Sequence, residues 1–194
     1  TLRARLPLRA LYQCENAALS ATACGILLKK EGRYDPAILK RGIERCFWPG
    51  RMEEILPGVF IDGAHNPDGI RAFLESAGQI CSRKENCGDG GRTLLLFSCV
   101  SDKDYSKELE MICRSGIFSD IVAVPMAGKR ALDAVTLRQY IGRYSSDMRI
   151  HDAESVRDAV ERFITGRDTK DRVFAAGSLY LAGEMRSLIS DSSE

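Results

Sequence analysis

The sequence lacks the features that would place it in a membrane or on a nucleic acid. No apolar run approaches the roughly 20 residues of a membrane-spanning helix, and the amino terminus does not show the basic-then-apolar layout of a signal peptide. Neither sign of charge is in excess, because 28 Lys and Arg residues alternate with 27 Asp and Glu residues. We therefore expect no membrane, no nucleic-acid partner and a cytoplasmic location.

Cysteine and histidine are present, but not at the spacing that metal sites need. The seven cysteines include no Cys-x-x-Cys pair, and the chain has only two histidines. Several cysteines stand inside apolar runs, where free thiols behave as small hydrophobic side chains. The sequence predicts free thiols in a reducing compartment, and no metal ligands within this chain.

Phosphate-loop motifs are missing as well. Gly128-Lys129 is followed by Arg130, and Ala123 stands where a Walker A motif needs its first glycine. No Gly-x-Gly-x-x-Gly sequence follows a predicted strand, and no Ser/His/Asp or Cys/His set indicates a nucleophile. His151, at the end of a predicted strand among charged residues, is expected at the surface.

Two helices are expected near the amino terminus. Small and apolar residues recur at helical spacing over residues 13–30, and Asp35-Pro36 provides an N-cap and a first helical residue for a second helix. Before them, leucines alternate with arginines, so Leu2 to Leu8 reads as a strand taken from the middle of a longer chain. Arg3, Arg5 and Arg9 fit the solvated face of an edge strand.

After Trp48-Pro49-Gly50, short apolar runs alternate with amphipathic helices. This alternation predicts an α/β domain with a Rossmann-like, mostly parallel sheet flanked by helices. We expect residues 47–194 to form that domain, residues 1–46 to belong to a preceding one, and Ser82 to Gly91 to form a surface loop. The expected strands are 59–61, 93–99, 120–125, 148–151 and 172–176; the expected helices are 67–81, 104–114, 133–144 and 153–165.

Ligands of such sheets bind beyond the carboxyl ends of the strands, and three loops there could carry chemistry. Asp62 to Pro67 offers a carboxylate and an imidazole beside a helix N-terminus, although every residue in it also suits a plain turn. Arg51, after Trp48-Pro49-Gly50, could meet phosphate oxygens or be a surface residue of a linker. Ser178, after Gly177, could bind a ligand or cap the last helix.

Taken in order, these segments resemble the folylpolyglutamate and dihydrofolate synthases of the Mur ligase superfamily. The Asp-Gly-Ala-His-Asn sequence at residues 62–66 resembles the folate branch rather than the cell-wall ligases. The matching pieces are Gln13 with Asn16-Ala17, Trp48-Pro49-Gly50-Arg51, Asp62 to Pro67, Asp102-Lys103-Asp104, Arg130-Ala131, and Gly177-Ser178-Leu179-Tyr180-Leu181.

The resemblance implies a role for five of these residues. Arg51 resembles the catalytic arginine that meets the ATP phosphates, Asp62 the aspartate at the nucleotide ribose, and Asn16 the asparagine near the adenine. His65, a second catalytic candidate, and Ser178 resemble residues around the incoming glutamate. The implied enzyme is a monomeric ADP-forming ligase of one-carbon metabolism that uses ATP, Mg²⁺, a reduced folate and L-glutamate, and forms an acyl phosphate on the folate.

Two departures from the family pattern stand out. Tyr12 occupies the position before Gln13 where the family usually has histidine. The family's phosphate loop, magnesium ligands and modified lysine would all lie upstream of Thr1, so this chain alone is expected to be inactive. A non-catalytic nucleotide- or ligand-binding module and a Mur-type cell-wall amino-acid ligase domain remain alternatives.

Overall fold

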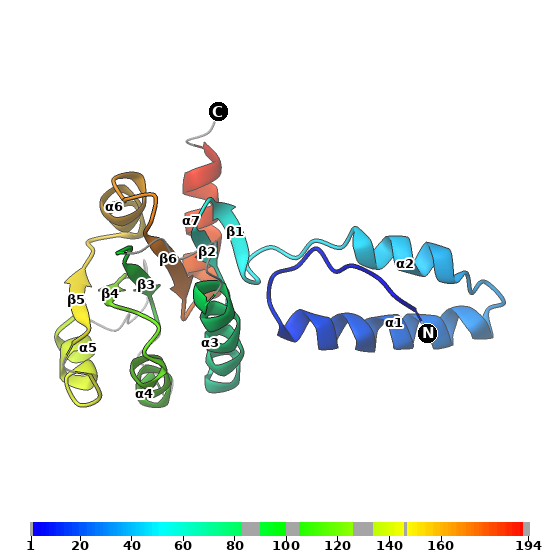
Figure 1. Cartoon of the computed structure of the whole chain (residues 1–194), viewed down its shortest axis with the longest axis horizontal. Helices are drawn as coiled ribbons and strands as arrows, with labels where there is room; N and C mark the ends of the chain where they lie inside the picture. The colour runs from blue at the N-terminus through cyan, green and yellow to red at the C-terminus, as the bar shows by residue number, and fades with distance from the viewer. Residues whose placement is uncertain (1, 83–89, 100–104, 126–133, 146, 192–194) are drawn as a thin grey trace.

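The chain folds into a helical arm beside an α/β sheet (Figure 1). The arm holds α1 (Tyr12–Lys30) and α2 (Pro36–Glu44), and a six-stranded sheet follows it in the sequence. Among the described residues, no helix is both long and apolar enough to cross a membrane. The computed structural model describes residues 2–82, 90–99, 105–125, 134–145 and 147–191.

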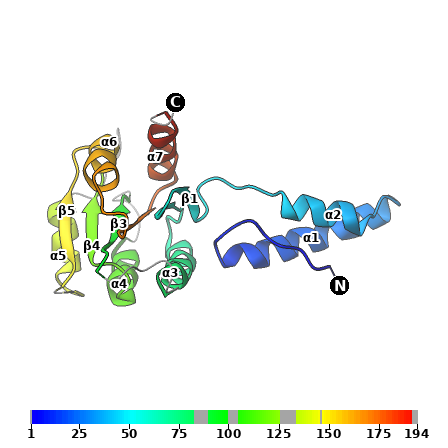
Figure 2. The same cartoon turned by 45° about the horizontal axis from the view of Figure 1, so that its top comes forward.

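Both helices predicted for the arm are confirmed. Asp35 caps α2 as its sequence position indicates, because its Oδ1 accepts hydrogen bonds from the N–H groups of Ala37 (2.7 Å) and Ile38 (3.3 Å). The two helices run side by side and are joined by a short turn (Figures 1 and 2).

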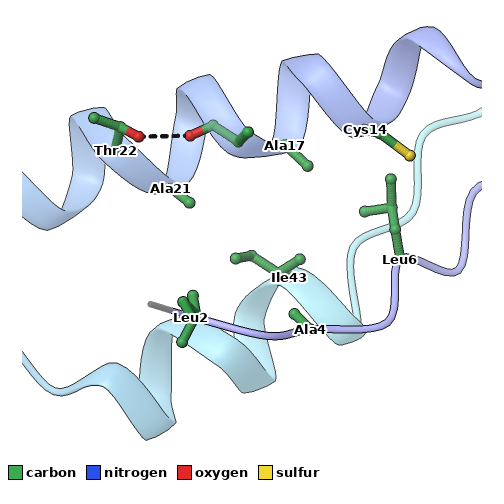
Figure 3. A pocket seen from close by; sticks show the side chains of 9 residues that line it. Leu2, Ala4, Leu6, Cys14, Ala17, Ala21, Thr22 and Ile43 are labelled. Atoms are coloured by element: carbon green, nitrogen blue, oxygen red, sulfur yellow. Dashed lines mark hydrogen bonds between the residues drawn. The ribbon is translucent and has the colours of Figure 1, made fainter.

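The strand expected over Leu2 to Leu8 is wrong, because residues 2–10 form no strand. They run along the two helices as an extended segment that pairs with no strand among the described residues. Leu2 and Leu6 turn instead toward α1 and Ile43 of α2, where they line a groove of about 340 Å³ (Figure 3). Burial against helices explains the alternation of leucine and arginine as well as a strand would.

The predicted Rossmann-like sheet is confirmed, with the strand order β1-β2-β6-β3-β4-β5. β2 to β6 are parallel, and β1 pairs with β2 in the antiparallel sense. All five expected strands are present, with ends that differ by at most two residues. The strands are β1 (Glu53–Leu56), β2 (Val59–Ile61), β3 (Thr93–Phe97), β4 (Asp120–Ala123), β5 (Arg149–Asp152) and β6 (Arg172–Ala176).

Helices cover both faces of the sheet, and each face has its own apolar core. On one face lie α3 (Pro67–Ser82), α4 (Tyr105–Ser115) and α5 (Ala134–Ile141), over a cluster that includes Phe60, Phe73, Phe118 and Phe174. On the other lie α6 (Val156–Val160), which continues as a π-helical turn over Glu161–Thr165, and α7 (Leu179–Asp191). The loop expected over Ser82 to Gly91 lies mostly outside the described residues.

A buried carboxylate joins the outer strands β4 and β5. Asp120 is fully buried and accepts hydrogen bonds from Ser119 Oγ (2.7 Å), Arg149 Nη2 (2.9 Å) and His151 Nε2 (2.8 Å). The His151 side chain is 31% exposed, so it reaches the surface as expected, but it is also a partner of Asp120, which the sequence did not indicate. Burial by itself would raise the pKa of Asp120, but the hydrogen bonds from His151, Ser119 and Arg149 outweigh it and lower that pKa.

We expect Asp120→Asn to lower the free energy of unfolding by about 2 kcal/mol, because the buried carboxylate loses its charge-assisted hydrogen bonds to Arg149 and His151. Thermal unfolding at neutral pH would measure the loss. Since the folded-state pKa of Asp120 is lowered, its stabilisation is present above the unfolded-state pKa of about 4 and is lost as the pH falls below it. Wild type and variant should therefore converge in acid.

The matched control is Asp152→Asn on β5, whose carboxylate pairs with Arg138 where both side chains are 54% exposed. Such a solvated pair contributes little, so the control should stay within about 1 kcal/mol of wild type. Equal losses for Asp120→Asn and Asp152→Asn would contradict the importance of the buried network.

Candidate functional site

Three loops meet at the carboxyl end of β2 and β6, as the sequence predicts. The Gly63 N–H donates to Gly50 O (2.8 Å), and the Gly177 N–H donates to Ala64 O (2.7 Å). The antiparallel β1 explains how the arginine loop arrives there, because Glu53 at its start pairs with Ile61 at the end of β2. Arg51 and Asp62 therefore lie at the same sheet edge.

Asp62 is the centre of this arrangement. Its side chain is 2% exposed and accepts hydrogen bonds from Tyr12 Oη (2.8 Å) and from the backbone N–H groups of Met52 (2.9 Å) and Ala64 (2.8 Å). One carboxylate thus joins the first turn of α1, the arginine loop and the loop after β2. Burial raises the pKa of Asp62, against the opposing effect of these donors and of Arg51.

Tyr12 is the donor that reaches Asp62 from the arm. Burial, together with the negative charge of Asp62, raises the pKa of the Tyr12 hydroxyl far above its ordinary value of 10.0. The hydroxyl therefore keeps its proton at neutral pH and remains a donor to the carboxylate.

Arg51 lies half-buried against Gly63, in the loop after β2. Its Nη1 donates to Gly50 O (3.1 Å), and a Cβ added to Gly63 would overlap both that nitrogen and the Leu179 side chain. Both atoms are near the ends of flexible side chains, so an added Cβ would displace the Arg51 guanidinium and the Leu179 side chain from their positions. The guanidinium presents several donors in a planar fork, which suits phosphate or carboxylate oxygens.

His65 and Asn66 follow at the start of α3. The Nδ1 of His65 lies 2.8 Å from Gly63 O, and because a carbonyl oxygen only accepts, this contact places a proton on Nδ1. Asn66 Oδ1 accepts from the Gly69 N–H (2.8 Å), and α3 begins at Pro67. Asn66 therefore caps α3, and Pro67 is its first residue.

One pocket of about 290 Å³ brings together four of the five residues proposed from the sequence. Asn16 lines it from α1, and Arg51, Asp62 and His65 line it from the sheet edge. Asn16 Nδ2 donates to Gln13 Oε1 (3.3 Å), within the same turn of α1. The groove in the arm is larger, but it is lined by leucine and alanine and lacks these charged groups.

Ser178, the fifth residue, is not among the residues that line this pocket. It is buried at the start of α7, and its Oγ accepts from the Tyr180 N–H (3.1 Å). The capping alternative for Ser178 therefore has direct support. Its neighbour Gly177 still holds this loop to the Asp62 loop through Ala64.

Tyr12 was missed as a site residue. The sequence signal was its place one helical turn before Asn16, where it departs from the family pattern; only the fold shows that its hydroxyl reaches Asp62. Asp102-Lys103-Asp104 and Arg130-Ala131 lie outside the described residues. Within the described residues, no group of three or more His, Cys, Asp or Glu could hold a metal ion.

Comparison with known proteins gives a consistent match over nearly the whole chain. The family model for the Mur ligase, glutamate ligase domain matches residues 50–179. The folylpolyglutamate synthase of Lacticaseibacillus casei is 29% identical over 186 residues, which cover 93% of this chain and 39% of that protein. The dihydrofolate synthase/folylpolyglutamate synthase of Bacillus subtilis is 29% identical over 191 residues, covering 94% of this chain and 40% of that protein.

A solved structure agrees. Mycobacterium tuberculosis folylpolyglutamate synthase complexed with ADP superimposes with a TM-score of 0.74 at 26% identity, over 95% of this chain and 41% of that one. The chain thus spans about two fifths of the length of these relatives. The match of the family model over most of the chain, with the fold and the loop geometry described above, shows that the chain belongs to the Mur ligase family and carries its glutamate ligase domain.

Proposed function

We propose that this chain is the carboxy-terminal part of an ATP-dependent ligase that adds glutamate to folates and releases ADP and phosphate. The observation that carries the proposal is the pocket that gathers Asn16, Arg51, Asp62 and His65. The similarity to folylpolyglutamate synthases, one of them complexed with ADP, also supports the proposal, because it extends over at least 93% of the chain.

In the proposed reaction, a folate carboxylate attacks the terminal phosphate of ATP and becomes an acyl phosphate. The glutamate amine then attacks the acyl carbon, an amide forms, and phosphate leaves. The protein's task is to position the reactants and to offset charge that develops on the transferred phosphoryl group. Magnesium bound with the ATP would share in that neutralisation.

Arg51 has the chemistry for the phosphates, because its planar guanidinium fork borders the pocket. Asn16 can pair with the adenine through its amide. Asp62 Oδ1 accepts one bond from Ala64 among the described residues and has capacity for a ribose hydroxyl. We place His65 and Ser178 near the incoming glutamate.

We further propose that residues 1–46 belong with a preceding ATPase domain and residues 47–194 form the second domain. The arm exposes large apolar side chains on both helices, among them Leu19 (71%), Leu27 (60%) and Ile38 (57%). Apolar area of this kind is typical of a surface that another domain covers. We propose that the intact enzyme is a monomer in the cytoplasm.

The test is an ADP-release assay on the intact protein with MgATP, a reduced folate and L-glutamate. We expect ADP only when all three are present, and no ADP from the 194-residue chain alone, whose sequence contains no phosphate-loop motif. ADP formed with a nucleotide-linked cell-wall peptide in place of the folate would favour the cell-wall ligase. No ADP with either acceptor would favour the binding module.

A further inference from the structure

Among the described residues, few polar contacts join the arm to the sheet. The Leu11 N–H donates to Ser76 Oγ (3.2 Å), Arg9 pairs with Glu54, and Tyr12 Oη donates to Asp62 Oδ2 (2.8 Å). The Arg9 side chain is 50% exposed, so its ion pair is solvated and weak. The bond from Tyr12 differs, because its acceptor is a buried charge.

This bond lies in the wall of the candidate nucleotide pocket. Tyr12 and Asn16 line the pocket from α1, and the other residues that line it come from the sheet side. Tyr12 and Asn16 are four residues apart, so they occupy the same face of the helix one turn apart. Any rotation of α1 away from Asp62 would carry Asn16 away from Arg51.

Asp62 connects Tyr12 to the arginine loop through hydrogen bonds. The Oδ2 atom that accepts from Tyr12 also accepts from the Met52 N–H (2.9 Å). Met52 is 1% exposed and holds a positive φ of 47°, which a residue with a side chain adopts at a cost. The backbone after Arg51 is therefore held in place partly by the same carboxylate oxygen.

We infer that Tyr12 is a positioning residue that holds the first turn of α1 against Asp62 and so fixes Asn16 opposite Arg51 across the nucleotide pocket. The inference rests on the proposed function for the identity of the ligand. The held geometry itself is a property of this chain, and it can be measured without any turnover.

The experiment uses Tyr12→Phe in the intact protein, because phenylalanine keeps the ring that packs on the core and removes only the donor. Loss of a hydrogen bond to a charged group weakens an interaction by about 10- to 100-fold. We therefore expect KM for ATP to rise by about that factor. We expect kcat to change by less than about threefold, since binding is lost equally from ground state and transition state. KM for glutamate should stay near wild type.

Two further variants separate positioning from general stability. Tyr34→Phe removes a hydroxyl from the same arm at a residue whose ring contacts Lys29, and it should leave every kinetic constant unchanged. Tyr12→His supplies an N–H donor at the same place and should restore part of the affinity for ATP. A merely structural role would not produce the rise in KM at constant kcat or the rescue by histidine.

Hydrogen exchange gives a readout that does not depend on activity. Without nucleotide, Tyr12→Phe should speed deuterium uptake at the Met52 and Ala64 amides, and Tyr34→Phe should not. Unchanged exchange together with an unchanged KM for ATP would overturn the inference, and so would a fall in kcat at constant KM. A wild-type protein that makes no ADP would refute the proposed function instead, and hydrogen exchange would still decide whether Tyr12 holds the arm.

Discussion

Replacing Arg51 with alanine is expected to lower kcat of the intact ligase by about 10³-fold or more, the range attributed to a catalytic arginine in phosphoryl transfer. The guanidinium borders the pocket and, within the part of the chain that the structure describes, makes one hydrogen bond, to the carbonyl of its neighbour Gly50. Removing it therefore takes away little that stabilises the fold. ADP release under saturating substrates measures the effect.

Arg51→Lys tests whether the planar fork matters beyond the charge. Lysine keeps the charge but loses the paired donors, so we expect activity between those of wild type and Arg51→Ala. The matched control is Arg71→Ala on α3, whose side chain is 56% exposed and pairs with Asp68. Wild-type turnover in Arg51→Ala would remove Arg51 from the mechanism.

Gly177→Ala is expected to cause the largest loss of stability, about 4 kcal/mol. Gly177 has a φ of 96°, which side chains rarely adopt, and an added Cβ would overlap the Ser98 carbonyl oxygen and the Phe97 ring. Both obstacles belong to the central strand β3 and the residue that follows it, so neither can move freely. Chemical denaturation of wild type and variant would measure the difference.

Gly183→Ala is the matched control for that prediction. Gly183 lies inside α7, six residues further along, and a Cβ there would meet no atom within 4 Å. Alanine is favoured over glycine inside a helix, so this variant should gain about 1 kcal/mol. A similar loss in both variants would show that the closeness of β3 does not explain the glycine at 177.

Most of the sheet was predictable because the inner parallel strands β2, β3, β4 and β6 are mostly buried, and β2, β3 and β6 read as short apolar runs. The edge strand β5 is more exposed and more polar. β1 was missed because Glu53 and Glu54 make half of it polar; both carboxylates accept nearby N–H groups, from Gly50 and Gly58. The segment before α1 shows the opposite error, a strand that was predicted where none forms. Its alternation is typical of a strand, but helices, rather than a neighbouring strand, bury its leucines.

The candidate site was predictable in its loops and less so in its contacts. Turn residues and the rule for strand ends placed Arg51 and Asp62 at one edge of the sheet. No local pattern could show that Tyr12, fifty positions earlier, would donate to Asp62, because that contact depends on how the arm docks. For Ser178, both alternatives fitted the sequence, and the short Oγ contact to the Tyr180 N–H supports capping.

The hairpin formed by β1 and β2 limits where the chain can gain or lose residues. Glu53 pairs with Ile61 in this hairpin, whose turn contains Pro57-Gly58. That pairing determines the position of Arg51, two residues before Glu53. One inserted codon in the turn could slip the pairing by a residue, which would shift Arg51 by about 3.3 Å and turn neighbouring side chains to the opposite face. Insertions and deletions should therefore be rare in this turn among descendants that keep the activity.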